Sequence, residues 1–516
     1  MTKIVYIPLD ERPCNYYFPA ALSEGTGFTM AAPPLSMMGA KKQPANTEQL
    51  WEWLLSEVKD AAGAVISLDT LVYGGIIPSR LHDLSTEQCL DKLNRLQKLK
   101  EANPSLRLYA LSLIMRCPQY SSDDEEPDYY KDWGREIFRQ GYIGHRQQLG
   151  IATEEEKLEK ADIDDKLPLS VLNDYLHRRR INIEINKQAV KLVQDGTIDF
   201  MIVPQDDSAP FGLTTLDQQQ VREAIAEAKL DLKIYMYPGA DEVGCTLLAR
   251  MINHFKGQRP LVYPRFSSLQ GPFITPLYED RPLYESVKYQ ILAAGGLICS
   301  SISEADLVLF INSPGETMME SVSQNHPNVG YQVFRNLAEL VEMADFCAGE
   351  LGKPCIVADI GFANGSDKNL VELLRQKKLL FRLAGYAGWN TSSNTLGTCI
   401  AQGMIYHIYG ETEQHLNFLS LRYTEDAGYC SYVRQYIKEH KLPMLGMDYF
   451  RVDGQRGKAA EAVKEELERF VETHINDETY RVVIEDVYMP WSRMFEVGLR
   501  TKLQKKERDR EIEGLA

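Results

Sequence analysis

The sequence predicts an α/β protein built on parallel strands, for two reasons. Short apolar segments recur along the chain, and they are continuously apolar, as is typical of strands buried on both faces. Segments with apolar residues at intervals of three or four lie between several of them, which indicates alternating strands and helices. Eight principal strands favour a TIM-like (β/α)8 barrel with long insertions and a C-terminal α-rich region. An open doubly wound α/β sheet is the alternative architecture.

The eight predicted strands are each followed by polar residues. In chain order they are IVYIPL before Asp10-Glu11-Arg12, GAVISL before Asp69, LYALSLI before Met115-Arg116, IDFMIVP before Gln205-Asp206-Asp207, KIYMYPG before Ala240-Asp241-Glu242, LVLFI before Asn312, PCIVA before Asp359 and FRLAGYAG before Trp389-Asn390. FTMAAP near residue 30 and LVYPRF near residue 262 could be further strands, so the count leaves both architectures open.

Helical periodicity is clearest in four segments. They are TEQLWEWLLSEVKDA, TEQCLDKLNRLQKLKEA, TTLDQQQVREAIAEAKL and KNLVELLRQKKL. We expect residues 1–405 to form the α/β catalytic domain, with insertions at about 117–195 and 243–305 that break the regular alternation. Residues 406–516 are expected to form the C-terminal α-rich region, because EAVKEELERFVETHIN has a helical pattern there.

Composition excludes several classes of partner. The 516 residues include 57 Lys and Arg against 73 Asp and Glu, a formal net charge of −16. We therefore expect neither a nucleic-acid nor an anionic-membrane partner, since both require clustered basic residues. No secretory signal and no apolar run long enough to span a membrane is visible. The nine cysteines form no CxxC pair. This pattern predicts reduced thiols, a cytoplasmic location, no dedicated metal site and no cofactor.

Asp206 and Asp207 are the strongest candidate catalytic residues. They leave the fourth predicted strand at its carboxyl end, where α/β proteins place their active sites. Two neighbouring acids push each other's pKa values apart, and a glycosidase needs one protonated acid and one group that stabilises positive charge. Adjacent acids suit substrate assistance, in which one orients an N-acetyl group and the other donates the proton. An Asx-turn followed by a helix N-cap explains the same residues about equally well.

Two other acidic groups follow strands. Asp241 and Glu242 precede a predicted helix, and a helix dipole favours acids in its first turn, which is the competing explanation for this doublet. Asp10 and Arg12 precede Pro13, and Arg12 could pair with a carboxylate or bind a ligand. The alternative is a structural ion pair that closes one end of the predicted barrel.

The remaining candidate site residues contribute polar groups and an aromatic surface. Asp69 and Arg116 follow the second and third strands, and GFANGSD and AGWNTSSNTLGT supply the other candidates, Asn364, Asp367, Trp389 and Asn390. A pyranose has an apolar face and polar edges, so an aromatic ring beside amides is a typical sugar site. Glycine-rich turns whose Asn residues satisfy backbone groups are the alternative.

Several motifs resemble a bacterial family known only as a domain of unknown function. They are IPLDERPCN, SLDTLVYGG, QDDSAP, PGADE, DIGFANGSD, GWNTSSNTLGT and PWSRMFEVG, and they span nearly the whole chain. The resemblance implies a soluble bacterial protein of about this length and implies no activity.

Two local similarities are chemically more informative. QDD after a fourth strand is similar to the Asp-Asp pair of O-GlcNAcase-type hexosaminidases, which implies that Asp206 orients the acetamido group and Asp207 is the acid/base. PGADEV is similar to the GGDEV segment of other β-N-acetylhexosaminidases, where an Asp-Glu pair has the same two roles, although Ala240 replaces a glycine. Only one of the two doublets can be the catalytic pair, and the strand count favours Asp206-Asp207.

We therefore expect a retaining glycoside hydrolase that acts on a small N-acetylated amino-sugar conjugate, without a metal. Its partner is a small carbohydrate, and a homo-oligomer is possible. One alternative is a divalent-metal-dependent hydrolase or isomerase of a polar metabolite, with Asp10, Asp69, Asp206 and Asp241 as oxygen ligands. The other is a non-catalytic sugar-binding protein.

Overall fold

The computed structural model describes residues 1–506 and divides into two compact units. Unit 1 comprises residues 1–260, 272–298 and 391–405, and unit 2 comprises residues 261–271, 299–390 and 406–516. The predicted α/β domain, residues 1–405, is thus distributed over both units, and the predicted C-terminal region belongs to unit 2. The difference arises because the chain leaves and re-enters each unit, which no local sequence pattern reveals.

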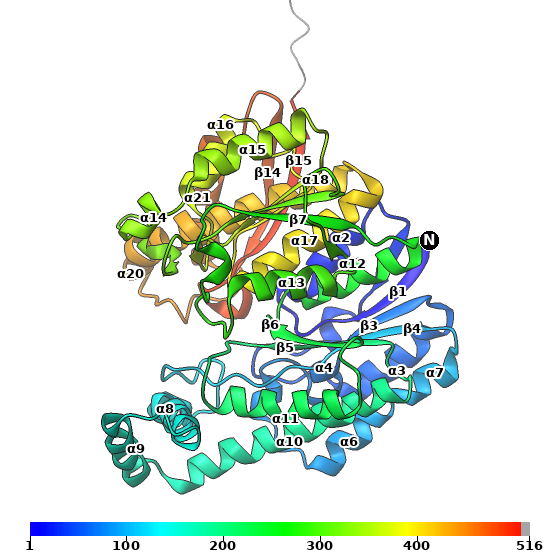
Figure 1. Ribbon diagram of the computed structural model, residues 1–516, viewed down its shortest axis with the longest axis vertical. Coiled ribbons are helices and arrows are strands. Elements are labelled where there is room, and N and C mark those ends of the chain that lie inside the picture. Colours follow the sequence, from blue (N-terminus) through cyan, green and yellow to red (C-terminus); the bar gives the residue numbers. More distant parts are fainter. Residues whose placement is uncertain (507–516) are drawn as a thin grey trace, which may run out of the picture. The chain divides into compact units, whose positions relative to one another are not determined.

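Unit 1 contains a six-stranded parallel sheet (Figure 1). In spatial order its strands are β2 (Phe28–Ala31), β1 (Thr2–Ile7), β3 (Gly63–Ser67), β4 (Arg107–Leu111), β5 (Phe200–Gln205) and β6 (Ile234–Pro238), and every neighbouring pair is parallel. The first five predicted strands are confirmed, and FTMAAP is the additional strand β2.

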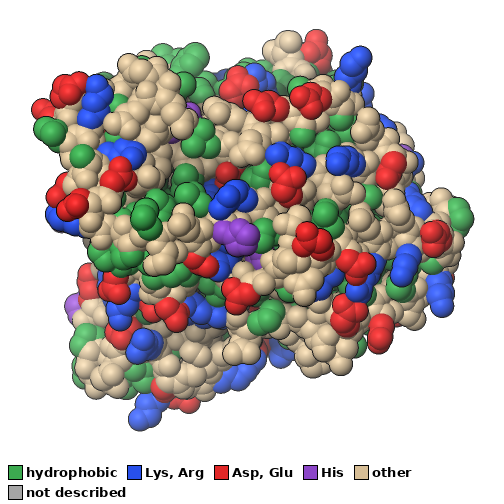
Figure 2. All heavy atoms as spheres, turned by 90° about the horizontal axis from the view of Figure 1, so that it is seen from below, with side chains coloured by type: hydrophobic (Ala, Val, Ile, Leu, Met, Phe, Trp, Pro, Cys, Tyr) green, Lys and Arg blue, Asp and Glu red, His purple; other side chains and the backbone are tan. Residues whose placement is uncertain are grey.

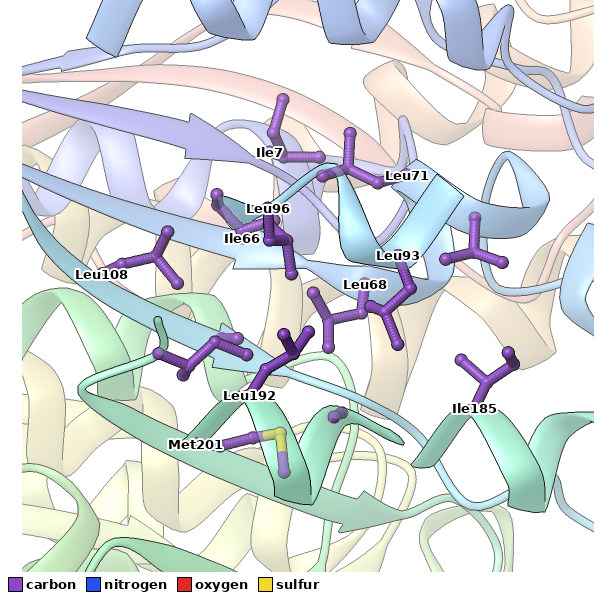
Figure 3. Packing of buried hydrophobic residues seen from close by; sticks show 14 of the residues in the cluster. Ile7, Ile66, Leu68, Leu71, Leu93, Leu96, Leu108, Ile185, Leu192 and Met201 are labelled. Carbon is purple, nitrogen blue, oxygen red and sulfur yellow. The ribbon is translucent and has the colours of Figure 1, made fainter. Parts of the chain in front are cut away.

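Helices cover both faces of this sheet. Those of the described part of unit 1 are α1 (Pro13–Tyr16), α2 (Phe18–Ser23), α3 (Thr47–Glu57), α4 (Leu68–Tyr73), α5 (Pro78–Leu81), α6 (Thr86–Asn94), α7 (Gln97–Ala102), α8 (Tyr130–Gln148), α9 (Glu154–Lys166), α10 (Leu169–Gln194), α11 (Leu213–Glu227), α12 (Val243–Lys256), α13 (Leu283–Ala293) and most of α17 (Ser392–Tyr409). Two residues of β3 illustrate the two faces of the sheet. Ile66 points into the core shown in Figure 3, and Gly63, on the opposite face, lies against Met251 of α12. Burial on both faces explains why the strands are continuously apolar.

The core shown in Figure 3 packs the sheet against helices predicted from their periodicity. Ile7, Ile66, Leu108 and Met201 from four strands meet leucines of α4, α6 and α10. The predicted helix at TEQCLDKLNRLQKLKEA forms as α6 and α7, and Ser85 and Gln88 make a capping box at its start. Long helices α8, α9 and α10 fill most of the predicted insertion at 117–195.

The closed barrel that the sequence favoured is not found. β2 and β6 lie at opposite ends of the sheet, and neither pairs with the other among the described residues. The order β2-β1-β3-β4-β5-β6 is that of an open doubly wound sheet, the alternative architecture, and places the topological switch point between β1 and β3. Strand count alone cannot separate the two architectures, because closure depends on which strands pair.

A second sheet has five strands and the same kind of order. Its strands are β13 (Gly385–Ala387), β11 (Cys355–Asp359), β9 (Leu307–Asn312), β7 (Leu261–Phe266) and β8 (Leu297–Ile298) in spatial order. LVYPRF is therefore a strand, β7. If these five strands are renumbered 1 to 5 in chain order, their spatial order, starting from β8, is 2-1-3-4-5. This order again describes a doubly wound parallel sheet, and its switch point lies between β7 and β9.

The rest of unit 2 is largely helical, with two small sheets. The helices are α14 (Val329–Val333), α15 (Leu337–Gly349), α16 (Lys368–Gln376), α18 (Glu413–Arg422), α19 (Arg434–Tyr436), α20 (Leu442–Leu445) and α21 (Lys458–His474). β10 (Met319–Glu320) pairs with β12 (Phe362–Ala363), and β14 (Tyr480–Tyr488) with β15 (Gly498–Lys505). A π-helix over Tyr423–Val433 continues α18. Apart from the β14–β15 hairpin, the expected α-rich C-terminal region is present.

Candidate functional site

Polar side chains collect at the carboxyl edge of the sheet in unit 1. Asp10 and Arg12 follow β1, Asp69 follows β3, and Asp206-Asp207 follow β5. Parallel strands bring these ends to one edge, as the sequence predicted. The side chains form two ion-pair networks, which we name by their arginines.

The Arg12 network joins the ends of β1 and β6. Arg12 Nη2 donates to Asp10 Oδ2 and to Asp241 Oδ1, both at 2.6 Å, and Arg12 Nε donates to Asp10 Oδ2 at 2.8 Å. Asn15 Nδ2 donates to both carboxylates, at 3.0 and 2.9 Å. All four side chains are buried. One guanidinium thus holds together two segments more than 220 residues apart in sequence.

The Asp241-Glu242 doublet is divided between two environments. The Asp241 backbone N–H donates to Asn394 Oδ1 at 3.0 Å, and its carboxylate belongs to the Arg12 network. Glu242 is fully buried and accepts from Gln290 Nε2 at 2.8 Å and from the Ala240 N–H at 2.9 Å. Burial raises the pKa of Glu242 to about 7. The Glu242 side chain thus caps no N–H of α12 but ties the turn after β6 to Gln290 of α13, and a substrate contact for it stays a prediction.

The Arg80/Arg116 network contains two arginines and four carboxylates. Arg80 Nη2 donates to Asp206 Oδ2 at 2.7 Å, and Arg116 Nη1 donates to Asp207 Oδ2 at 3.0 Å. Glu125 and Glu126 each accept hydrogen bonds from both arginines. The second oxygen of Glu126, Oε2, is buried without a hydrogen-bond partner. Each candidate catalytic acid thus has its own arginine.

Asp206 and Asp207 form the turn that follows β5 and are partly exposed. Their side chains keep 16% and 23% of their accessible surface, so a ligand can reach both. Asp207 has a backbone φ of 41°, in the left-handed region that non-glycine residues rarely adopt. Such strain is concentrated at functional sites. Desolvation and the neighbouring charge of Asp206 raise the pKa of Asp207 to about 7.

Asp69 is buried next to these networks. Its Oδ2 accepts from the Leu113 N–H at 3.0 Å, which ties the end of β3 to the segment after β4. Desolvation raises its pKa to about 7, and the charge of Arg80 opposes that increase. Asp69 thus ties two strand ends together, and a substrate contact for it stays a prediction.

Three further site residues were not predicted from the sequence: Asn15, Glu125 and Glu126. Asn15 lies three residues after Arg12 on the first helix, so only its proximity to Arg12 could have indicated it. Glu125 and Glu126 belong to the acidic segment SSDDEEPDYYKDWG inside the predicted insertion, and nothing in that segment indicates its arginine partners. Asn394 was expected to contribute a polar group from AGWNTSSNTLGT, and its segment returns to unit 1, where it accepts from the Asp241 N–H.

The other predicted site residues, Asn364, Asp367, Trp389 and Asn390, lie in unit 2. Asp367 Oδ2 accepts from Arg335 Nη1 at 2.5 Å, and Asn312 Nδ2 bridges Asp367 and Asp359 at 3.2 and 2.8 Å. Desolvation and the charge of Asp367 raise the pKa of Asp359 to about 8. This buried network occupies the carboxyl ends of β9 and β11.

Trp389 and Asn390 end the segment after β13. Trp389 is 8% exposed, and the Arg422 guanidinium lies over its ring at 5.9 Å. The carbonyl of Asn390 accepts from the Asn364 N–H at 2.8 Å, and both asparagines have positive φ. These contacts agree with the turn interpretation of the two asparagines. A sugar platform at Trp389 stays a prediction.

Five buried or partly buried carboxyls with raised pKa values predict a pH-dependent stability. They are Asp69, Asp207, Glu242, Asp359 and Asp426, with pKa values of about 7 to about 8. A carboxyl whose pKa is higher in the folded protein stabilises the fold fully below its unfolded pKa of about 4, and this contribution is lost as pH rises through the folded value. We expect the free energy of unfolding to fall as pH rises from about 4 to about 8, and to level off above that.

Urea denaturation across this pH range measures the effect. Asp69→Asn is the informative variant, because an amide oxygen can still accept from the Leu113 N–H while the titration disappears. Its slope should be smaller than that of the wild type, and Asp231→Asn, on an exposed residue, should keep the wild-type slope. A flat wild-type profile would contradict the raised pKa values.

Figure 2 shows acidic and basic side chains interspersed on one face, without a large patch of one sign. Within residues 1–506, no group of three His, Cys, Asp or Glu side chains is arranged to hold a metal ion. No helix in the same range is long and apolar enough to cross a membrane.

Comparison with known proteins identifies the family and no activity. No curated protein matches the chain. Residues 4–500 match the family model described as "Protein of unknown function (DUF4127)". This match covers nearly the whole chain, including both networks at the edge of the first sheet. The protein therefore belongs to the DUF4127 family.

Proposed function

We propose that the protein is a retaining glycoside hydrolase that cleaves a small N-acetylated amino-sugar conjugate with the help of the substrate's own acetamido group. The observation that carries the proposal is the asymmetry of the Asp206-Asp207 turn. Both acids pair with an arginine, Asp206 with Arg80 at 2.7 Å and Asp207 with Arg116 at 3.0 Å, but Asp207 also has a backbone φ of 41° and a pKa raised to about 7. A carboxyl with a raised pKa beside a second carboxyl is typical of a general acid paired with a charge-stabilising group.

The geometry supports a specific division of roles. Asp207 keeps a proton near neutral pH and can donate it to the leaving-group oxygen. Arg116, 3.0 Å from Asp207 Oδ2, then stabilises the carboxylate that remains. Asp206 is anchored by Arg80, so its carboxylate can orient the acetamido N–H while the acetamido oxygen attacks the anomeric carbon. Neither role requires a metal.

The charge of the edge supports a substrate without negative groups. The Arg80/Arg116 network has four carboxyl groups and only two guanidinium groups, so an anionic substrate would be repelled. The carboxyl groups are those of Asp206, Asp207, Glu125 and Glu126. All nine cysteines are free thiols, which supports a reducing, cytoplasmic setting for the reaction.

Kinetic assays with matched substrates test the proposal. Purified protein should hydrolyse an aryl N-acetylhexosaminide and leave the matching aryl hexoside, which lacks the acetamido group, nearly uncleaved. Failure to hydrolyse any aryl N-acetylhexosaminide, in either anomeric form, would refute the proposal. Tight binding of the sugars without turnover would instead favour a sugar-binding protein.

A further inference from the structure

Glu126 bridges the two arginines that pair with the candidate catalytic acids. Its Oε1 accepts from Arg80 Nη1 at 3.2 Å and from Arg116 Nε at 2.7 Å. Because the two guanidinium groups carry the same charge, an anion between them is what allows them to lie side by side. The Glu126 side chain is 1% exposed, so it acts on a substrate only through these arginines.

The bonds to Glu126 leave each arginine with one nitrogen atom that faces one acid. Arg116 donates from Nε to Glu126 and from Nη1 to Asp207, at 3.0 Å. Arg80 donates from Nη1 to Glu126 and from Nη2 to Asp206, at 2.7 Å. A guanidinium is planar and its N–H groups point in fixed directions, so a bond on one side sets the direction of the others.

The main chain that carries both arginines is held by α10. Tyr175 Oη and Arg179 Nη1 donate to the Arg116 carbonyl, at 3.0 and 2.8 Å. Asn182 Nδ2 donates to the carbonyl of the residue before Arg80, at 2.9 Å. These three residues of α10 are spaced by four and three positions, so they lie on one face of the helix. The backbones of the arginines are thus fixed, and the orientation that is left to set is that of their side chains.

Glu126 is itself carried by a well-held segment. Pro127 follows it, which disfavours helical backbone conformations at Glu126. The Pro127 carbonyl accepts from the Tyr130 N–H at 2.8 Å, at the start of α8, and Tyr130 Oη donates to the Pro118 carbonyl at 2.7 Å. These bonds close the loop that begins two residues after Arg116 and hold its carboxylate in place.

Stability alone does not explain a carboxylate at this position. Glu126 Oε2 is buried and has no hydrogen-bond partner, which costs free energy. Without Glu126, three carboxyl groups would still face the two guanidinium groups, so neither buried cation would lose its counter-ion. A buried group left unsatisfied calls for an explanation other than stability.

We propose that Glu126 is a positioning residue, which orients Arg80 and Arg116 so that each presents one N–H group to one acid of the turn after β5. This role rests on the proposed function, because Glu126 acts through the acids that carry the reaction. Once Asp207 has given its proton to the leaving oxygen, only a correctly oriented Arg116 stabilises the carboxylate that forms.

Two substitutions of similar size test this role in kinetics. Glu126→Gln keeps an oxygen that can accept from both arginines, whereas Glu126→Leu removes it. With an aryl N-acetylhexosaminide, we expect Glu126→Leu to lower kcat by up to about 10²-fold, the cost of a misplaced group, and to leave KM nearly unchanged. Glu126→Gln should restore most of kcat. Glu101→Leu, on an exposed residue of the same unit, should keep wild-type kinetics.

Crystal structures of the wild type and both variants test the geometry without a substrate. Arg116 Nη1 should stay within hydrogen-bond distance of Asp207 in Glu126→Gln and move away from it in Glu126→Leu. The proposal is overturned if both arginines keep their positions in Glu126→Leu, if this variant keeps wild-type kcat, or if Glu126→Gln loses as much kcat. A wild-type protein that cleaves no aryl N-acetylhexosaminide refutes the proposed function instead, and the arginine positions then support or overturn the orienting role by themselves.

Discussion

Replacing Asp207 with asparagine is expected to lower kcat for an aryl N-acetylhexosaminide by about 10²–10⁴-fold, the usual contribution of a general acid. An amide has nearly the shape of the carboxylic acid but cannot give a proton to the leaving oxygen. The fold should tolerate the change, because it removes the charge that Asp206 repels and leaves an oxygen that can still accept from Arg116.

The pH profile separates loss of an acid from loss of structure. With a pKa of about 7, Asp207 is protonated below that pH, so wild-type kcat/KM should fall as pH rises above about 7. The residual activity of Asp207→Asn should lack this descending limb. Asp231→Asn, a matched change on an exposed residue of the same unit, should keep both the rate and the profile. Wild-type kinetics in a pure Asp207→Asn preparation would exclude Asp207 as the acid.

Replacing Arg12 with methionine is expected to destabilise the protein by about 3–5 kcal/mol. Methionine fills much of the volume of the arginine stem, so the main change is electrostatic. Asp10 and Asp241 would be left buried, at 3% and 5% exposure, without the guanidinium that holds them both. Removing one partner of a buried ion pair is costly because the remaining charge has lost its solvation and gains nothing in return.

Urea denaturation at neutral pH measures this loss, with Arg259→Met, on an exposed arginine of the same unit, as the control. Adding Asp241→Asn to the Arg12→Met variant should recover part of the stability, since it removes one uncompensated charge. A loss below about 1 kcal/mol would show that the network contributes no more than a surface ion pair.

Local patterns predicted most of the elements of this fold. Continuous apolar runs marked β1, β3, β4, β5 and β6, and the three-to-four spacing marked helices such as α3 and α11, because each pattern reflects burial within one element. They could not predict that the strands form two open sheets. Strand pairing joins segments far apart in sequence, and a ladder such as β7 beside β9 leaves no trace within either strand.

The candidate site was predicted in the same partial way. Asp206, Asp207, Asp10, Arg12 and Asp241 were predicted because polar residues follow buried strands, and strand ends meet at one edge. Glu125 and Glu126 were not predicted, because they reach Arg80 and Arg116 from an insertion. The adjacent acids Asp241 and Glu242 also looked equivalent in the sequence. In the structure both are buried, but Asp241 pairs with the Arg12 guanidinium and Glu242 accepts from the amide of Gln290.

The sequence by itself determined the α/β class, the acidic strand ends and the family motifs, since each depends on residues that are neighbours along the chain. Only the tertiary structure decided that the sheets stay open and that each acid of the Asp206-Asp207 turn has its own arginine. The physical reason is that protonation depends on burial and on charges within a few ångströms. Those neighbours come from segments that folding brings together.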